Sequence, residues 1–307
     1  MPGPAGMTRG EPPAAEGFGH LGPRAGPQSP TPDSLGPQSP TPDSLGAIAR
    51  LCSSCLPDPP DEEELSGILY APDRPAVLQG DPQVGIVATG IDQDRGFVKL
   101  LCVDPAHQGK GYGHLLLEAA ETVLRKGGAS SVTVGADAPY FLYPGVETTQ
   151  TSMLCLLERH HYKRVDVNYN MAVDLRAIPP DPGGAEPADP GELGEISSWM
   201  EQHWSFWKSE VLRALSKRTL MVTRDRHGLS GFCAYNVNRK GTVGPVAVRP
   251  ELIGKSVGTR VLLGALHRMR RDGYLSAEVL WVGPVVPYAR VGAQVSRVFF
   301  VYRADLG

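Results

Sequence analysis

The sequence predicts an α/β (α+β) protein of two similar halves, each a mixed, mostly antiparallel sheet flanked by helices. Two observations predict this class. A strand-like run, a glycine-rich turn and a helix-like run follow one another over residues 97–125, and the same order recurs over residues 243–271. Around both copies, short strand-like runs alternate with helix-like runs, so helices can flank a sheet in each half.

The first half opens with helix-like runs and then becomes strand-rich. Its third strand reads Phe-Val-Lys-Leu-Leu-Cys-Val, which alternates enough for a half-buried strand. The helix after it has apolar residues at helical spacing and stops at Gly127-Gly128. The predicted elements are helices at 45–56 and 61–69, strands at 76–79, 84–91 and 97–103, a helix at 114–125, a strand at 131–135, a helix at 149–159 and a strand at 162–174.

The second half repeats this plan. Its long helix has an apolar stripe, arginines in the last turn, where cations suit the helix dipole, and Gly273 as a stop. The predicted elements are helices at 192–203 and 206–215, strands at 220–223, 230–236 and 241–248, the long helix, and strands at 277–282 and 297–302.

The composition divides the 307 residues into four parts. Residues 1–46 are rich in Pro, Gly and Ser and contain a perfect repeat of residues 26–35, so they predict a disordered tail. Residues 47–176 form the N-terminal domain, 177–190 a Pro/Gly-rich linker, and 191–307 the C-terminal domain.

Charge and cysteine usage exclude several classes. A net charge of −3 without a long basic block argues against a nucleic-acid partner, and no apolar run suits a membrane span. Five cysteines make no disulfide framework, and the Cys52-x-x-Cys55 pair has no second pair to complete a zinc site. We therefore expect a cytoplasmic protein without metal, nucleic-acid or membrane partners, and leave a homodimer open.

The segment Val-Asp-Pro-Ala-His-Gln-Gly-Lys-Gly-Tyr-Gly at 103–113 predicts an anion site. Glycines let the backbone approach a phosphate, and the free N–H groups of the next helical turn point at it. A Walker A loop is rejected, because Gly111 follows Lys110 and because Arg249 takes the place of the first glycine in the later copy. A dinucleotide fingerprint is weak, since Leu116 stands where its last glycine belongs.

The remaining pattern, Val-x-Pro-x-x-Gln-Gly-x-Gly-x-Gly, resembles the acetyl-CoA loop of the GNAT superfamily of N-acetyltransferases. The resemblance covers about everything after residue 46, which makes the chain look like a tandem of two such domains. It implies acetyl-CoA as cosubstrate, with the pantetheine arm along one strand and the pyrophosphate on the loop. The implied cofactor-binding residues are Leu101, Cys102, Val103, Gln108, Gly109, Lys110, Gly111, Tyr112, Gly113 and His114, and in the second copy Val248, Gly254, Lys255 and Gly258.

The two copies depart from the family pattern in different ways. The first keeps its glycines but has Leu157 where the family often carries a tyrosine, and His161 in place of a glycine. The second keeps Tyr288 but has Ile253 and Ser256 in its loop. Cofactor binding is therefore expected above all in the first half, and a family-like acid in the second.

The resemblance implies direct attack of an uncharged amine on the thioester. A general base must remove a proton from the amine, and a tyrosine can protonate the departing thiolate. The candidate acids are Tyr288 and, in the first half, Tyr140 or Tyr143, while no carboxylate stands out as the base. Four aromatic residues near the start of the second half suit either an amine site or core packing: Trp199, Trp204, Phe206 and Trp207.

The sequence therefore supports two functions. The first is an acetyl-CoA-dependent N-acyltransferase that acts on the primary amine of a small molecule or peptide. The alternative is a catalytically silent CoA-binding module with a regulatory or assembly role, which the departures in both copies suggest.

Overall fold

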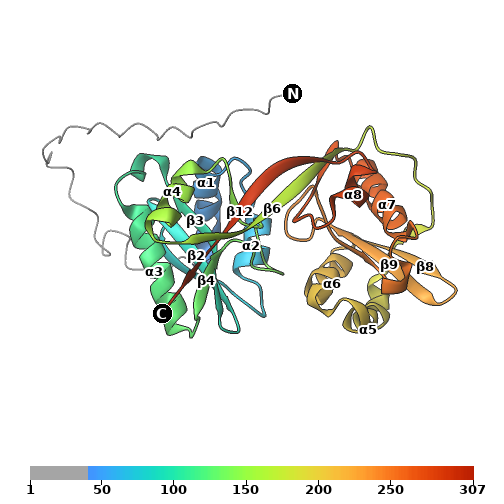
Figure 1. Ribbon diagram of the computed structural model, residues 1–307, viewed down its shortest axis with the longest axis horizontal. Coiled ribbons are helices and arrows are strands. Elements are labelled where there is room, and N and C mark those ends of the chain that lie inside the picture. The colour runs from blue at the N-terminus through green and yellow to red at the C-terminus, as the bar shows by residue number, and fades with distance from the viewer. Residues whose placement is uncertain (1–40) are drawn as a thin grey trace, which may run out of the picture.

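The computed structural model describes residues 41–307 (Figure 1). The sequence predicted a disordered tail over residues 1–46, of which residues 1–40 lie outside the described part of the chain. The last residues of this predicted tail are helical from Pro42 onward. The first half comprises α1 (Leu45–Cys55), α2 (Glu62–Leu69), β1 (Val77–Asp81), β2 (Gly85–Asp92), β3 (Arg95–Val103), α3 (Tyr112–Lys126), β4 (Ser131–Val134), β5 (Val146–Glu147), α4 (Thr151–Arg159) and β6 (Lys163–Asp174).

The second half repeats the order of elements that the sequence predicts. It comprises β7 (Ala185–Pro187), α5 (Leu193–His203), α6 (Lys208–Ser216), β8 (Leu220–Asp225), β9 (Gly228–Tyr235), β10 (Thr242–Val248), α7 (Val257–Arg271), β11 (Ser276–Val279), α8 (Val285–Ala289) and β12 (Gln294–Asp305). Three short elements escaped prediction: β5, α8, and β7, which lies inside the predicted linker and pairs with β8.

The strands form one twelve-stranded sheet that both halves share. Its order is β1-β2-β3-β4-β12-β6-β11-β10-β9-β8-β7, with β5 beside β12. Neighbours are antiparallel except β3 with β4 and β10 with β11, which are parallel. This confirms the predicted α/β class with a mixed, mostly antiparallel sheet.

The halves exchange their last strands. The final strand, β12, lies in the sheet beside β4 of the first half, with Tyr302 opposite Val134. The first half's own last strand, β6, pairs with β11 of the second half, with Met171 opposite Val279. Figure 1 shows β6 and β12 running together from one half into the other. The predicted domain boundaries follow the order of the chain, whereas each half of the sheet contains a strand from the other half.

Helices cover both faces of the sheet in each half. In the first half, α1 and α2 pack on one face and α3 with α4 on the other. In the second half, α5 and α6 bury one face and α7 the other. Leu157, which departs from the family pattern, is fully buried in the core beneath α4. No helix among residues 41–307 is long and apolar enough to cross a membrane.

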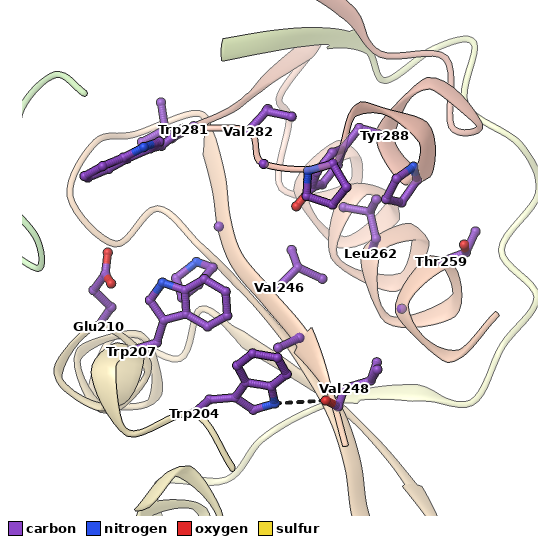
Figure 2. Close-up of a pocket in the computed structure, with 18 of the residues that line it drawn as sticks. Trp204, Trp207, Glu210, Val246, Val248, Thr259, Leu262, Trp281, Val282 and Tyr288 are labelled. Atoms are coloured by element: carbon purple, nitrogen blue, oxygen red, sulfur yellow. Dashed lines mark hydrogen bonds between the residues drawn. The ribbon is translucent and has the colours of Figure 1, made fainter. Parts of the chain in front are cut away.

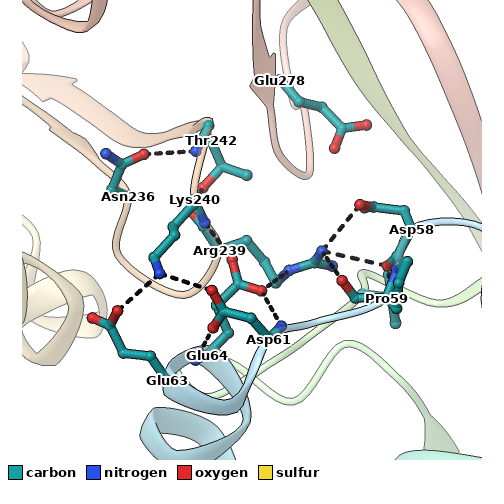
Figure 3. A network of polar contacts seen from close by, with 12 residues as sticks. Asp58, Pro59, Asp61, Glu63, Glu64, Asn236, Arg239, Lys240, Thr242 and Glu278 are labelled. Carbon is teal, nitrogen blue, oxygen red and sulfur yellow. Dashed lines mark hydrogen bonds and ion pairs between the residues drawn. The ribbon is translucent and has the colours of Figure 1, made fainter. Parts of the chain in front are cut away.

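A network of charges, buried at Arg239 and exposed at Lys240, joins the halves (Figure 3). Arg239, in the turn between β9 and β10, donates from Nε to Glu64 on α2 at 3.1 Å and from Nη2 to Asp58 at 3.1 Å. Lys240 pairs with Asp61 at 2.7 Å and with Glu63 at 2.9 Å. The turn that follows β9 is therefore anchored to the first half.

Arg239→Lys is expected to lower the free energy of unfolding by about 1 to 2 kcal/mol, because lysine keeps the charge but loses the planar fork that reaches two carboxylates. Arg239 and Glu64 are only 8% and 9% exposed at their side chains, so water would replace the lost bonds poorly. Urea unfolding measures the effect. Arg270→Lys, at an exposed position on α7, is the matched control. An equal change in both variants would contradict the assigned role of the network.

Candidate functional site

Each half has one place where two parallel strands diverge. In the second half, β10 and β11 pair only at Thr242 with Glu278 and at Val243 with Val279. Beyond that point β10 continues beside β9 to Val248, after an irregularity in its register. The separating strands leave polar backbone groups without a sheet neighbour, which suits a ligand that adds on as a strand would.

A cavity of about 850 Å³ opens at this divergence (Figure 2). Its walls come from the α5–α6 connection and α6, from β10, from the loop before α7, from the segment after β11, and from α8. The lining residues with chemical interest are Trp204, Trp207, Glu210, Ser256, Trp281 and Tyr288.

The corresponding place in the first half is almost closed. Strands β3 and β4 pair from Arg95 with Ser131 to Val98 with Val134 and then diverge, but the cavity there measures only about 40 Å³. Leu56, Tyr143 and Met153 are among the side chains that line it. This cavity is thus much smaller than that of the second half. The cavities therefore favour the second half, whereas the sequence favoured the first.

Both glycine loops have the same local geometry, as the repeat predicts. Each follows a short 3₁₀ turn and leads into a helix of 15 residues. Gly109 and Gly254 have φ values of +71° and +81°. Gly111 and Ser256, which precede the helices, are both left-handed, at +93° and +62°. Each loop thus presents the free N–H groups of a first helical turn to an anion.

Ser256 departs from glycine in sequence but keeps glycine's backbone conformation. A left-handed φ costs a non-glycine residue about 1 kcal/mol, and such residues often occur where a ligand binds. The loop of the second half therefore retains the shape of the first, and the serine does not close it.

The other predicted cofactor residues lie at the end of β3, at the end of β10 and in the two glycine loops. The side chains of Cys102 and Val103 are buried, and that of Leu101 is half-buried. The Val103 carbonyl accepts from Gln108 Nε2 at 3.0 Å, just as the Val248 carbonyl accepts from Trp204 Nε1 at 2.9 Å. The remaining loop residues are exposed or half-buried. In the first half they are Lys110, Tyr112, Gly113 and His114, and in the second half Lys255 and Gly258.

Of the three candidate tyrosines, only Tyr288 lines the large cavity. It lies on α8, and burial raises the pKa of its hydroxyl to about 12, so the group keeps its proton at neutral pH. The Tyr143 hydroxyl donates to the carbonyl of Asp58, and the Tyr140 hydroxyl donates to Asp73. Both of those hydroxyls are used within the first half.

The structure adds a carboxyl that the sequence did not single out. Glu210 on α6 lines the same cavity as Tyr288 and is only 5% exposed. Burial raises the pKa of this carboxyl to about 7, and the positive charge of Arg213 only partly offsets that rise. Figure 2 shows Glu210 and Tyr288 on opposite sides of the cavity. A signal existed in the sequence, since Glu210 shares the apolar face of α6 with Val211 and Ala214.

The aromatic group near the start of the second half divides into two sets. Trp204, Phe206 and Trp207 line the cavity. Trp199 belongs to the core, where its Nε1 donates to the Leu229 carbonyl at 2.9 Å. Core packing is confirmed for Trp199, and Trp204 and Trp207 also pack against this core. An amine site at Trp204, Phe206 and Trp207 stays a prediction.

The donor set suits a coenzyme with a diphosphate and an amide-bearing arm. The free N–H groups at the start of α7 would hold the phosphates, and the edge of β10 would pair with the arm. Among residues 41–307, no cluster of three or more His, Cys, Asp or Glu side chains is placed to hold a metal ion.

The mixed sheet, whose parallel strands separate beside a glycine loop, can now be compared with known proteins. Residues 50–140 match the model of the acetyltransferase (GNAT) family. Over this segment, which is less than a third of the chain, the first half is similar to GNAT acetyltransferases, a family that generally uses acetyl-CoA. No curated protein matches the sequence.

Solved structures share the fold over most of the chain. The glucosamine N-acetyltransferase region of a fungal multi-domain GH3 β-N-acetylglucosaminidase aligns with a TM-score of 0.71 and 21% identity, over 87% of this chain and 38% of that one. A GCN5-related N-acetyltransferase from Sphaerobacter thermophilus aligns at 0.66 and 21%, over 88% and 95%. A tandem GNAT protein from the clavulanic acid biosynthesis pathway aligns at 0.63 and 16%, over 86% and 95%. At these identities the likeness establishes the fold.

Proposed function

We propose that this chain is a tandem of two GNAT domains and acts as an acetyl-CoA-dependent N-acyltransferase on the primary amine of a small molecule or peptide. The reaction takes place in the cavity of the second half. One observation carries the proposal: Glu210 and Tyr288 line the same cavity, which leads to the glycine loop before α7.

Each residue has a distinct task in this proposal. Bound acetyl-CoA supplies an electrophilic thioester carbonyl. The Glu210 carboxylate accepts a proton from the acceptor ammonium or amine, directly or through one water, and so leaves the nitrogen lone pair free to attack. Tyr288 donates its hydroxyl proton to the thiolate that departs. The apolar walls keep bulk water from competing with the amine.

The pKa values suit these roles. A carboxyl with a pKa of about 7 is a stronger base than an exposed glutamate and is still substantially ionised at neutral pH. A tyrosine with a pKa of about 12 is protonated at neutral pH and can act as an acid. The two groups therefore have opposite protonation states, as the reaction needs.

Gly254→Trp is expected to weaken acetyl-CoA binding by about 100-fold or more, because the new side chain would occupy the space where the diphosphate approaches the loop. Gly109→Trp is the matched control at the equivalent position. Both glycines have a positive φ, and no atom lies within 4 Å of an added Cβ at either, so the backbone strain is similar. Titration calorimetry with acetyl-CoA measures the affinity of each variant.

Loss of binding in Gly109→Trp with full binding in Gly254→Trp would overturn the assignment to the second half. The silent-module alternative requires acetyl-CoA binding with no thiol release above background for any amine. The cytoplasmic location and the homodimer stay predictions from the sequence.

A further inference from the structure

We propose, on the basis of the function above, that the acceptor is a small primary monoamine carried on one six-membered ring, aromatic or pyranose, with neither a carboxylate nor a second cationic group. The observation behind this is that two groups of aromatic side chains line the same cavity as Glu210: Trp204, Phe206 and Trp207 pack on one another, and Trp281 meets Phe141. Figure 2 shows Trp281 apart from Trp204 and Trp207, with Glu210 beside Trp207. We call these two groups the walls of a ring-binding slot.

The first wall of the slot is a stack of aromatic rings. Trp207 lies on Trp204 with ring centroids 5.5 Å apart and an interplanar angle of 29°. Phe206 packs on Trp207 at 4.5 Å and is 64% exposed. Phe206 thus adds an exposed apolar ring to those of Trp204 and Trp207 at the cavity.

The second wall comes from a separate part of the chain. Trp281 follows β11, and Phe141 of the first half meets it edge-on with centroids 5.3 Å apart. The backbone of Trp281 has a φ of +47°, an unfavourable conformation for a residue with a side chain. Its N–H donates to Oδ1 of Asn170 at 2.9 Å, and Asn170 is almost fully buried. This strained, anchored backbone holds the indole ring at the cavity.

Aromatic rings that line a cavity favour a ligand with a flat apolar face. An aromatic ring stacks on them, and the apolar C–H face of a pyranose packs on tryptophan in a similar way. An ammonium group beside such rings also gains from their electron-rich faces. A flexible, ring-free amine would use little of this surface.

The charges of the cavity limit the rest of the acceptor. Glu210 is the one anionic side chain that lines the cavity within residues 41–307, so it can partner one ammonium group. A carboxylate on the acceptor would meet this like charge. Asn238 and Thr242 are already engaged: Asn238 accepts from Arg213 at 2.9 Å and donates to the Pro139 carbonyl, and Thr242 donates to the Arg239 carbonyl. One cationic side chain, that of Arg290, also lines the cavity. It lies just after α8 and is exposed to solvent, unlike the buried Glu210.

Acetylation rates of matched amines test this inference. The ring monoamines 2-phenylethylamine and glucosamine are compared with phenylalanine, which adds a carboxylate, and with 1,4-diaminobutane, which has a second cation and no ring. Thiol release at fixed acetyl-CoA gives kcat/KM. We expect at least one ring monoamine to exceed both comparators by about 10-fold or more, and the better of the two identifies the type of ring. Comparator rates equal to or above those of both ring amines would overturn the inference.

Trp207→Leu provides a second test. It is expected to reduce the ratio of kcat/KM for the preferred ring amine to that for propylamine by about 10-fold, because only the ring amine loses a stacking surface. A purely structural role would lower both rates together and leave the ratio unchanged. Trp281→Leu tests the opposite wall in the same way, should the first variant fail to fold.

Binding separates failure of this inference from failure of the proposed function. If no amine releases thiol, the transferase proposal fails. In that case, each amine is added to the protein in the presence of CoA, and quenching of tryptophan fluorescence reports whether the amine binds, independently of catalysis. Quenching by ring monoamines, but not by 1,4-diaminobutane, supports the slot, and equal or absent quenching overturns it.

Discussion

Glu210→Gln is expected to lower kcat by about 10² to 10⁴-fold, the usual contribution of a positioned general base. Glutamine keeps the size and the buried position of the side chain but cannot accept the proton of the amine. Thiol release under saturating acetyl-CoA and acceptor measures the effect. Calorimetric titration with acetyl-CoA should show unchanged affinity, because Glu210 lies on α6 and the glycine loop precedes α7.

If the proposed reaction takes place, the same carboxyl should govern its pH profile in the native protein. The base works only when ionised, so kcat/KM is expected to rise with pH through a pKa near 7, the value to which burial raises Glu210. The Glu210→Gln variant should lose this step. A step that persists in the variant would assign the titration to another group.

As the pH rises through the pKa of Glu210, the stability of the native protein should fall while its activity rises. The folded pKa of Glu210 is raised from 4.5 to about 7, so its favourable contribution to stability is complete below the unfolded value and is lost as pH rises through the folded value. That loss amounts to about 3 kcal/mol. Glu210→Gln is therefore expected to be more stable than the native protein at pH 9, with the gap closing towards pH 5, in urea unfolding.

Glu195→Gln is the control for both effects. Glu195 is an exposed carboxyl on α5, the helix before α6. Its replacement should leave kcat and the pH dependence of unfolding unchanged. If Glu195→Gln and Glu210→Gln lower kcat equally, the catalytic role of Glu210 is wrong.

Tyr288→Phe is expected to lower kcat by about 100-fold, because the variant cannot protonate the departing thiolate. The KM for acetyl-CoA should change little, since the phenyl ring keeps its packing against the core beneath α7. Acyl donors with more acidic thiols should be affected less, because their thiolates depart without help. Steady-state kinetics with acetyl-CoA and a more acidic thioester measures both effects.

Tyr140→Phe and Tyr143→Phe are matched controls, because each removes the same hydroxyl from a residue that the sequence had placed among the candidate acids. Both hydroxyls donate within the protein, to Asp73 and to the carbonyl of Asp58. Each variant should lose about 1 kcal/mol of stability and keep kcat. A loss of kcat in Tyr143→Phe, with none in Tyr288→Phe, would return the chemistry to the first half.

Local patterns predicted the elements well. The strand, glycine turn and helix at residues 97–125 were recognisable because turn chemistry and helical spacing act within a few residues of one another. The same holds for the second copy and for helix α1, which carries Cys52 and Cys55. Short elements such as α8 have too few residues for a periodic signal.

The site was harder to predict than the fold. The family resemblance singled out Tyr288 as a candidate, and its role stays a prediction. Glu210 owes its raised pKa to burial, which no single position in the sequence reveals. The sequence favoured cofactor binding in the first half because the loop there keeps all its glycines. The closed cavity there depends on side chains from separate parts of the chain, among them Leu56 and Tyr143.

The sequence by itself determined most of the secondary structure, the repeated glycine loop and the mixed class of sheet, because these follow from local spacing and backbone preference. Only the tertiary structure decided that β12 joins the sheet beside β4, that the open cavity belongs to the second half, and that Glu210 faces Tyr288 across it. The physical reason is that strand partners, void volume and desolvation are properties of segments that meet in space from distant positions in the chain.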